Sequence, residues 1–399
     1  MKKILALVFF TVTSRLFSAA FFSGETGAAA QFVNKDSRGF EPAVFIDGFF
    51  TGQFNLSNML SVRSEFSLRT PDMYDNGFTK DAAATFRINE LSATLTRSFL
   101  GATHSLSFFL GHFEAPGSQQ YIKRHLGVRN YSSHILENYL GQNGSLIYPL
   151  TGIGGSYSLT FKAHPVSTGL TISKDNSNFE DNPQINIDWH FATVSKLLTM
   201  DFLAGIGAPL YTKNSNDEDV YLLIDTLYFH MGLDLLFGNL YSVFSLYNRL
   251  GFEYMPIKST SKSKTLEISD IYLFVEPRFN FGSLKIHISA YSIPEARLEK
   301  LMFIDDTLGV DISIFSDDKS IGKRNYCIGC DLGMSFEGKF FNSLEDKDLM
   351  EKSNVKVMPF AEFQAGGGKL KTALQIGITK VVDNRADAVK LHFGYKKDL

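Results

Sequence analysis

Residues 271–290 read IYLFVEPRFNFGSLKIHISA, two runs of alternating residues on either side of a Gly-Ser pair. Apolar residues such as Ile271 and Leu273 occupy every second position, and polar residues such as Glu276 and Arg278 lie between them. Successive side chains of a strand point to opposite faces, so the pattern predicts two strands with one apolar and one polar face each. The short glycine-containing link predicts that they form an antiparallel hairpin.

The same alternation recurs along most of the chain, for example in the segments 60–69, 184–191, 198–206, 228–237 and 244–254. These runs are about ten residues long, the length that a tilted strand needs to cross a bilayer, whereas strands of soluble proteins average about five or six. Large charged side chains occupy the polar face of nearly every run. Soluble sandwiches and membrane barrels both alternate, but the strand length and these charges favour the barrel.

The connections between the runs alternate in length. Short ones lie at 55–58, 98–103, 163–165, 195–196, 238–239, 282–283 and 365–368. Long ones lie at 70–83, 114–150, 174–183, 209–219, 256–266 and 293–307. Up-and-down barrels of outer membranes have short periplasmic turns and longer outer loops, and a Greek-key sandwich has no reason for this rhythm. Aromatic residues flank two of the short links, as in an interfacial girdle: Phe237, Tyr241, Phe279 and Phe281.

The composition excludes several other classes of protein. The 399 residues include 37 Phe, 16 Tyr and 1 Trp, yet the mean hydropathy is only −0.03. Beyond the first twenty residues no run of 18 apolar residues predicts a membrane-spanning helix. The 39 basic and 42 acidic residues give a net charge of −3, which argues against a nucleic-acid-binding surface. The plentiful aromatic residues argue against disorder.

The N-terminus has the features of an export signal. Lys2 and Lys3 precede the apolar segment 4–12, and the small residues 18–20 predict cleavage after Ala20, with a second possible site after Ala30. We therefore expect residues 1–20 to be a signal peptide. Residues 21–42 are expected to be an N-terminal segment, either an extra strand or periplasmic, and residues 43–399 to be one domain.

In this pattern of strands and turns the mature chain resembles bacterial outer-membrane β-barrels, without a motif specific to one family. Its last alternating run resembles their C-terminal insertion signal, although four residues follow the final aromatic: Val389, Leu391, Phe393 and Tyr395, then Lys396-Lys397-Asp398-Leu399. The resemblance implies an all-β fold, a single transmembrane antiparallel up-and-down barrel of about 16 strands within a range of 14–18. A strand within 21–40 would raise the count to 18, but that segment lacks alternation. Outer-membrane lipid and the barrel-insertion machinery are the implied partners, and the pattern does not specify an oligomeric state.

The polar faces carry the residues that we predict to line the pore. They are Arg63, Glu65, Arg69, Asp188, Asp201, Arg249, Glu253, Glu276 and Arg278. Charges of both signs predict a mixed wall around water, because a barrel of 16–18 strands is wide enough to hold it. This favours a porin-like channel for passive or gated passage of small solutes. A surface-exposed adhesin or binding anchor, a transporter of hydrophobic solutes and a soluble secreted β-protein are the alternatives.

The longest connection, 114–150, is rich in basic residues. Its candidates for a constriction loop are Lys123, Arg124, His125 and Arg129. Long loops of porins can fold inward, and a basic loop facing acidic wall residues would create a transverse field. A loop on the outer surface is the simpler alternative.

No motif predicts catalysis, a cofactor or a metal site. Cys327-Ile328-Gly329-Cys330 lies in an alternating run, where positions i and i+3 point to opposite faces, too far apart for a disulfide unless the strand bends at Gly329. Two cysteines without a matching pair of histidines are too few for zinc. The run 366–369, Gly-Gly-Gly-Lys, lacks phosphate-loop spacing and predicts a hairpin turn, and 152–155 predicts close strand packing. No histidine lies near a nucleophile-elbow serine.

Overall fold

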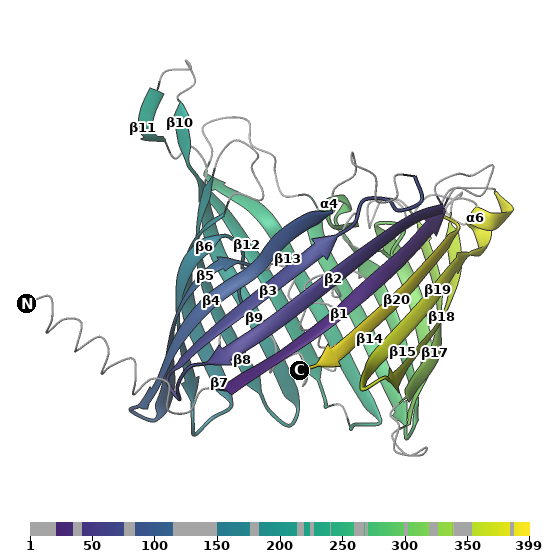
Figure 1. Ribbon diagram of the computed structural model, residues 1–399, viewed down its shortest axis with the longest axis horizontal. Coiled ribbons are helices and arrows are strands. Elements are labelled where there is room, and N and C mark those ends of the chain that lie inside the picture. The colour runs from purple at the N-terminus through teal and green to yellow at the C-terminus, as the bar shows by residue number, and fades with distance from the viewer. Residues whose placement is uncertain are drawn as a thin grey trace, which may run out of the picture.

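Antiparallel hairpins follow one another around a closed ring of 18 strands in the computed structural model (Figure 1). The structure describes residues 21–34, 42–75, 84–114, 150–175, 183–213, 219–223, 227–239, 241–258, 267, 270–298, 302–318, 326–336, 338, 353–383 and 387–399. The first barrel strand pairs with the last, which closes the ring. The predicted fold, a single antiparallel up-and-down barrel of the outer-membrane kind, is confirmed. The expected signal peptide, 1–20, lies outside the described residues.

The barrel is built from strands that are mostly nine to fifteen residues long. They are β1 (Phe21–Asn34), β2 (Pro42–Asn55), β3 (Leu60–Arg69), β4 (Thr85–Phe99), β5 (Ala102–Gly111), β6 (Ile153–Phe161), β7 (Val166–Asp175), β8 (Gln184–Val194), β9 (Leu198–Pro209), β12 (Leu227–Phe237), β13 (Phe244–Lys258), β14 (Ile271–Phe281), β15 (Leu284–Ser292), β16 (Leu308–Asp318), β17 (Tyr326–Phe336), β18 (Asn354–Ala365), β19 (Gly368–Gly377) and β20 (Val389–Asp398). A separate hairpin, β10 (Tyr211–Lys213) and β11 (Asp219–Leu223), rises beyond one rim (Figure 1). Two short helices, α4 (Glu295–Leu298) and α6 (Ile378–Val382), belong to the same rim.

The strand count is 18, the higher number that the sequence left open, because Phe21–Asn34 is a strand. The alternation typical of a strand is absent there because lumen-facing positions hold small residues such as Gly27 and Ala29. A Cβ on Gly27 would meet the ring of Phe49, so an aromatic side chain of β2 fills the space beside β1. An apolar–polar alternation is therefore not needed for this strand to pack.

The strand ends that short turns join lie at one end of the barrel, and the strand ends that longer connections join lie at the other (Figure 1). At the turn from β4 to β5, Gly101 has a φ of 75°, a left-handed conformation that favours glycine. The predicted turn at 366–369 is confirmed as the link between β18 and β19, with a φ of 80° at Gly367. An even number of strands brings both ends of the barrel to the short-turn side, where the C-terminus lies.

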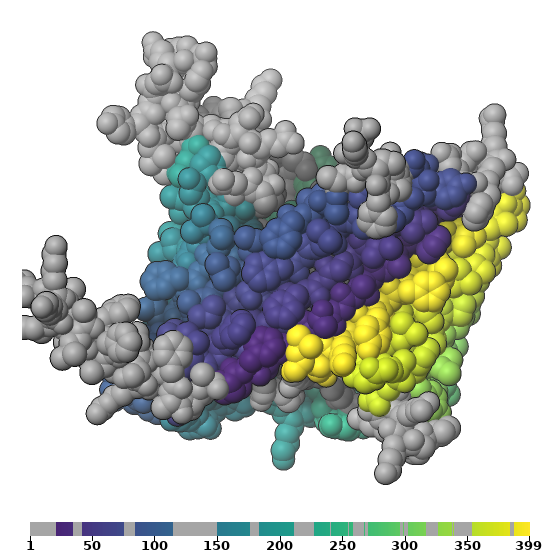
Figure 2. Space-filling model, viewed as in Figure 1, coloured from purple at the N-terminus to yellow at the C-terminus, as the bar shows by residue number. Residues whose placement is uncertain are grey.

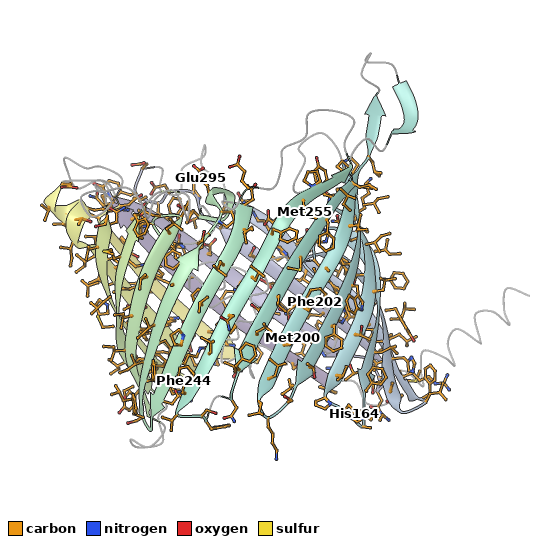
Figure 3. The ribbon with its side chains drawn as sticks, turned by 180° about the vertical axis from the view of Figure 1, so that it is seen from behind. His164, Met200, Phe202, Phe244, Met255 and Glu295 are labelled. Carbon is orange, nitrogen blue, oxygen red and sulfur yellow. The ribbon has the colours of Figure 1, made fainter. Side chains whose placement is uncertain are left out.

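The outer wall of the barrel is apolar. Exposed leucine, isoleucine and phenylalanine side chains alternate along the strands, and Met200, Phe202 and Phe244 lie on this wall (Figure 3). In the space-filling view the strands form a continuous surface crossed obliquely by β1, β2 and β20 (Figure 2). Exposed Phe237, Tyr241 and other aromatic residues ring the short-turn end, as expected of an interfacial girdle. In the described part of the chain, no helix has the length and apolar character needed to cross a membrane.

Candidate functional site: the lumen wall

The predicted pore residues of β3 lie on its lumen face, each close to polar groups of a neighbouring strand. Arg63 Nε is 3.2 Å from Glu90 Oε2, and Arg69 Nε is 3.9 Å from Asp47 Oδ1. Glu65, between the two arginines in the alternation, is fully buried. These charges therefore form local pairs on the wall, and Arg69 is the most exposed of them, with 43% of its side chain accessible.

A second group of predicted residues forms one network across β12, β13 and β14. Arg249 donates two hydrogen bonds to Asp234, from Nε to Oδ1 at 2.6 Å and from Nη2 to Oδ2 at 3.2 Å. Tyr247 donates its hydroxyl hydrogen to the same carboxylate at 3.1 Å, and the Arg278 guanidinium lies 4.4 Å from the centre of the Tyr247 ring. Arg278 also donates to Glu276 at 2.6 Å. The bidentate contact between Arg249 and Asp234 and the burial of these side chains hold the charges in fixed positions. The remaining predicted residue of β13, Glu253, is partly buried.

Asp188 pairs with a histidine two strands away. Asp188 on β8 and His230 on β12 both face Gly205, which lies on β9 between them. A Cβ on Gly205 would overlap the Asp188 carboxylate and the His230 ring, so the missing side chain is what lets the two meet. They form a direct, fully buried hydrogen bond between Asp188 Oδ1 and His230 Nε2.

The same device recurs on the other side of the barrel. Asp311 on β16 and Lys356 on β18 face Gly333 on β17, and Lys356 Nζ lies 3.5 Å from Asp311 Oδ1. At both places a glycine on the middle strand lets side chains of its two neighbouring strands pair across it. Each of these pairs therefore joins three strands of the lumen wall.

Two stretches of the wall each carry buried side chains of one charge sign. Strands β7–β9 contribute the buried carboxylates of Asp175, Asp188 and Asp201. Strands β18–β20 contribute the buried side chains of Lys356, Lys371 and Lys390. In the ring of 18 strands, β8 and β19 are nine strands apart in either direction, so the two groups belong to opposite walls. We call them the acidic wall (β7–β9) and the basic wall (β18–β20).

Apolar side chains also lie inside the barrel. One cluster joins lumen-facing residues of β8 and β12–β15 to the segment after β15: Ala192, Leu236, Tyr247, Tyr272, Phe274, Tyr291, Ile293 and Ile304. Another joins Phe303 of that segment to the basic wall at Phe360 and Ala373. The lumen is therefore lined by apolar as well as ionised groups, which the sequence pattern alone did not indicate.

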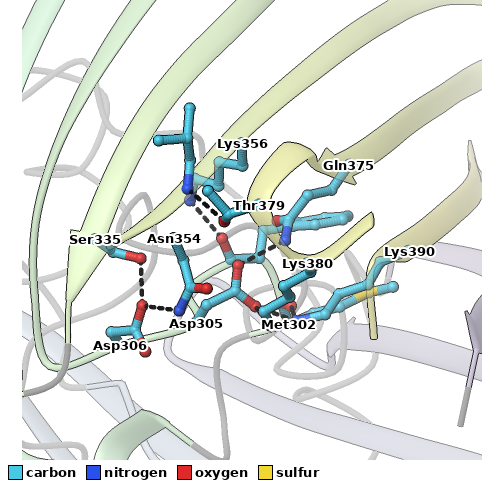
Figure 4. A network of polar contacts seen from close by, with 12 residues as sticks. Met302, Asp305, Asp306, Ser335, Asn354, Lys356, Gln375, Thr379, Lys380 and Lys390 are labelled. Atoms are coloured by element: carbon cyan, nitrogen blue, oxygen red, sulfur yellow. Dashed lines mark hydrogen bonds and ion pairs between the residues drawn. The ribbon is translucent and has the colours of Figure 1, made fainter. Parts of the chain in front are cut away.

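The connection 293–307, predicted as a long outer loop, turns inward at its end and docks on the basic wall (Figure 4). Asp305 accepts hydrogen bonds from Lys390 at 2.8 Å, Lys380 at 2.9 Å and Gln375 at 2.8 Å. Asp306 accepts from Ser335 and Asn354 at 2.6 and 2.7 Å; we call residues 302–307 the docked segment. Burial alone raises the pKa of Asp305, but the ammonium groups of Lys390 and Lys380 outweigh it and hold the pKa at about 2. The segment is therefore anchored by an ionised carboxylate.

The basic wall was not predicted, although the sequence contains its signal. Lys371 and Gln375 alternate with Leu370, Leu374 and Ile376, and Lys390 alternates with Val389 and Leu391. The same period-two argument that found the other wall residues applies there. The inward turn of the docked segment had no such signal, since its residues follow no alternation.

Two further predictions have different outcomes. The candidate constriction residues Lys123, Arg124, His125 and Arg129 lie outside the described residues; at the edge of that loop, Arg63 Nη1 is 3.7 Å from Glu114 Oε2. Whether Cys327 and Cys330 form a disulfide was left open by the sequence; they lie on the regular strand β17 and are not joined by one. Among the described residues, no group of three or more His, Cys, Asp or Glu side chains is placed to hold a metal ion.

Comparison with known proteins gives likenesses of structure alone. No protein-family model and no curated protein matches the chain. A quintuple variant of Rh. blastica porin covers 96% of this chain over 100% of its own length, at 12% identity and a TM-score of 0.46. A triple variant of Rhodopseudomonas blastica porin has the same coverage and TM-score at 11% identity. A loop-deletion variant of OmpT, an outer membrane protein of Vibrio cholerae, covers 96% of this chain over 99% of its own length, at 9% identity and a TM-score of 0.41. The strand pairing and the apolar outer wall establish the barrel independently of these likenesses.

Proposed function

We propose that this chain is a bacterial outer-membrane channel that lets small solutes pass through a polar, mixed-charge lumen. The observation that carries the proposal is a ring of 18 strands in which a stretch of buried acids on β7–β9 lies opposite a stretch of buried lysines on β18–β20. Barrels of this size enclose enough space for water, and charges facing each other across it would orient dipolar and ionic solutes. The proposal assigns no reaction and no cofactor to the chain.

The docked segment supports restricted rather than wide-open passage. It carries Phe303 and Ile304 into the interior, where both are buried. A segment that crosses from the rim to the wall reduces the free cross-section beneath it. Solutes of small size are therefore the expected cargo.

Transport of more apolar solutes is the second candidate, and the apolar clusters inside the lumen favour it. Tyr247, Phe274 and Tyr291 offer aromatic surface beside the ionised network of β12–β14. A solute with an apolar body and one charged group fits such a wall better than a uniformly apolar solute, because the aromatic surface lies directly beside ionised groups that a uniformly apolar solute would leave without a partner.

Placement in the outer membrane, export through a cleaved signal peptide and folding by the insertion machinery are parts of the proposal. The apolar outer wall and the aromatic residues near the short turns support contact with lipid. The first barrel strand begins at Phe21, directly after the predicted cleavage site at Ala20, so mature protein from the outer-membrane fraction is expected to start there. An intact-mass measurement tests this start.

Liposome swelling tests the channel itself. Purified protein is reconstituted into liposomes, and swelling is followed in sugars, amino acids and salts of increasing size. Rapid swelling with the small solutes and slow swelling with the large ones is expected. Folded barrel, identified by heat-modifiable migration on a gel, that gives no swelling with any solute would refute the channel and leave the anchor alternative.

A further inference from the structure

We propose that Gln375, Lys380 and Lys390 form a binding site for the carboxylate of a small organic acid with an apolar body, and that Asp305 of the chain itself occupies this site in the structure. The proposal rests on the channel function above and names the class of solute that it takes. The three residues are called the carboxylate site below.

The geometry of the site is that of a carboxylate receptor. Both oxygens of Asp305 are held: Oδ1 by Lys380 Nζ at 2.9 Å and Lys390 Nζ at 2.8 Å, and Oδ2 by Gln375 Nε2 at 2.8 Å (Figure 4). The donors come from β19, β20 and α6, whereas the acceptor comes from a distant connection. Only 3% of the Asp305 side chain is exposed. The wall therefore supplies a complete set of donors without contributing an acid of its own.

The carboxylate site itself concentrates positive charge. Lys380 and Lys390 both donate to Asp305 Oδ1, and among the described residues of β18–β20 no acid is buried beside them, while Lys356 of the same wall pairs with Asp311 of β16. Glu362 is only partly buried and lies 3.8 Å from the exposed Lys369. Two ammonium groups this close repel each other unless an anion lies between them. A solute carboxylate replaces the Asp305 carboxylate with no change in charge or in hydrogen bonds.

The surroundings specify the rest of the ligand. Two residues before Asp305, Phe303 packs against Phe360 and Ala373, and its ring stacks on His392 with centroids 6.3 Å apart and planes 26° from parallel. The docked segment thus presents an aromatic ring and a carboxylate together. A small aromatic acid carries the same two groups in one molecule, so we take benzoate as the probe.

The docked segment has a second anchor that stays in place when the first is exchanged. Asp306 is held by Ser335 and Asn354, and Thr307 Oγ1 donates to the Gly338 carbonyl at 2.8 Å. None of these partners belongs to the carboxylate site. A solute that displaces Asp305 therefore leaves the segment tethered at its C-terminal end, with Asp305 as an internal competitor at high effective concentration.

Calorimetric titration of the folded full-length protein in detergent tests the proposal. Benzoate is expected to bind Asp305→Asn about tenfold more tightly than the wild type, since the internal competitor is weakened. Benzamide, the neutral counterpart, is expected not to bind. Glu362→Gln is the matched control, because it removes an acidic charge that pairs with the exposed Lys369 and belongs to neither the carboxylate site nor the docked segment, and it should leave the benzoate affinity unchanged.

A second pair of variants keeps the outcome independent of folding defects. Adding Lys390→Gln to Asp305→Asn should abolish benzoate binding, while heat-modifiable migration shows that the double variant is folded. The proposal is overturned if Asp305→Asn does not bind benzoate, or if adding Lys390→Gln leaves benzoate binding unchanged. If inorganic phosphate binds Asp305→Asn as tightly as benzoate does, the site is not specific for carboxylates. Conductance in KCl is recorded in parallel. Conduction without benzoate binding refutes the site alone, and benzoate binding without conduction refutes the channel alone.

Discussion

The acidic wall and the basic wall satisfy their charges by different means. On the acidic wall Asp188 is paired with His230 of the barrel, and Asp175 accepts the hydroxyl hydrogen of Thr151, next to the strands. On the basic wall Lys390 relies on Asp305 and on the Met302 carbonyl, both from the docked segment. Asp188 of the acidic wall and Lys356 of the basic wall are therefore paired within the barrel, whereas Lys390 is paired by a connection that follows β15. Because the partner of Lys390 lies on a separate segment, a charged solute can replace it there.

Reversing a charge on the basic wall should have the largest effect. Lys390→Glu removes an ammonium group 2.8 Å from Asp305 and puts a second carboxylate in its place. Breaking a buried pair in this way costs about 3–5 kcal/mol of unfolding free energy. Urea unfolding in vesicles measures it through the single tryptophan, Trp189, which lies on the outer wall.

The matched control is Lys369→Glu on the same wall. Lys369 lies 3.8 Å from Glu362 with 55% of its side chain exposed, so the expected loss is at most about 1 kcal/mol. Equal losses in both variants would show that docking on the basic wall contributes nothing to stability.

Acid should weaken the docked segment at Asp305. Because the Lys390 and Lys380 ammonium groups overcome the effect of burial and lower the pKa of Asp305 to about 2, below the unfolded value of about 3.9, the contribution is fully present above about pH 4. It is lost as the pH falls through about 2, and its full size is about 2.5 kcal/mol. The unfolding free energies of wild type and Asp305→Asn should differ by that amount at about pH 6 and converge near pH 2. A difference that does not change with pH would contradict the ionised anchor.

Adding a methyl group to the bridging glycines tests both walls in the same way. Gly205→Ala should separate Asp188 from His230, and Gly333→Ala should separate Asp311 from Lys356, each at a cost of about 1–3 kcal/mol. Gly48→Ala is the control, since nothing lies within 4 Å of the added Cβ. Urea titration of the three variants compares them. If all three are equally stable, the pairing over glycine does not matter.

Ion selectivity should show the smallest effect, with opposite signs for the two walls. Asp201→Asn removes a negative charge and should favour anions, and Lys371→Gln should favour cations. One charge about 10 Å away in water is worth about 0.4 kcal/mol, or roughly a twofold change in the permeability ratio. Reversal potentials in a KCl gradient measure this ratio. A shift of the same sign in both variants would remove the distinction between the walls.

The fold follows from the sequence wherever each strand alternates, as in 271–290, because period two and short turns leave few other structures for such a chain. It could not be predicted at β1, where the small residues Gly27 and Ala29 face the lumen and Phe49 fills the space. The mixed charge of the wall was visible in the sequence, but its separation into opposite walls was not. That property depends on which strands lie half a ring apart, and therefore on the count of 18.

The docked segment shows the other limit of sequence analysis. Length alone indicates a long connection at 293–307, and nothing in the local pattern specifies that it turns inward. The inward turn depends on Asp305 meeting Lys390, which lies 85 residues later in the chain. Only tertiary structure joins these two residues.

The seam between β1 and β20 has a consequence for the order of assembly. Glu25 and Lys396, which pair across it at 2.7 Å, are 371 residues apart. The first strand to be synthesised therefore waits for the last before its open edge is covered, and the unpaired N–H and C=O groups of an open edge invite pairing with other chains.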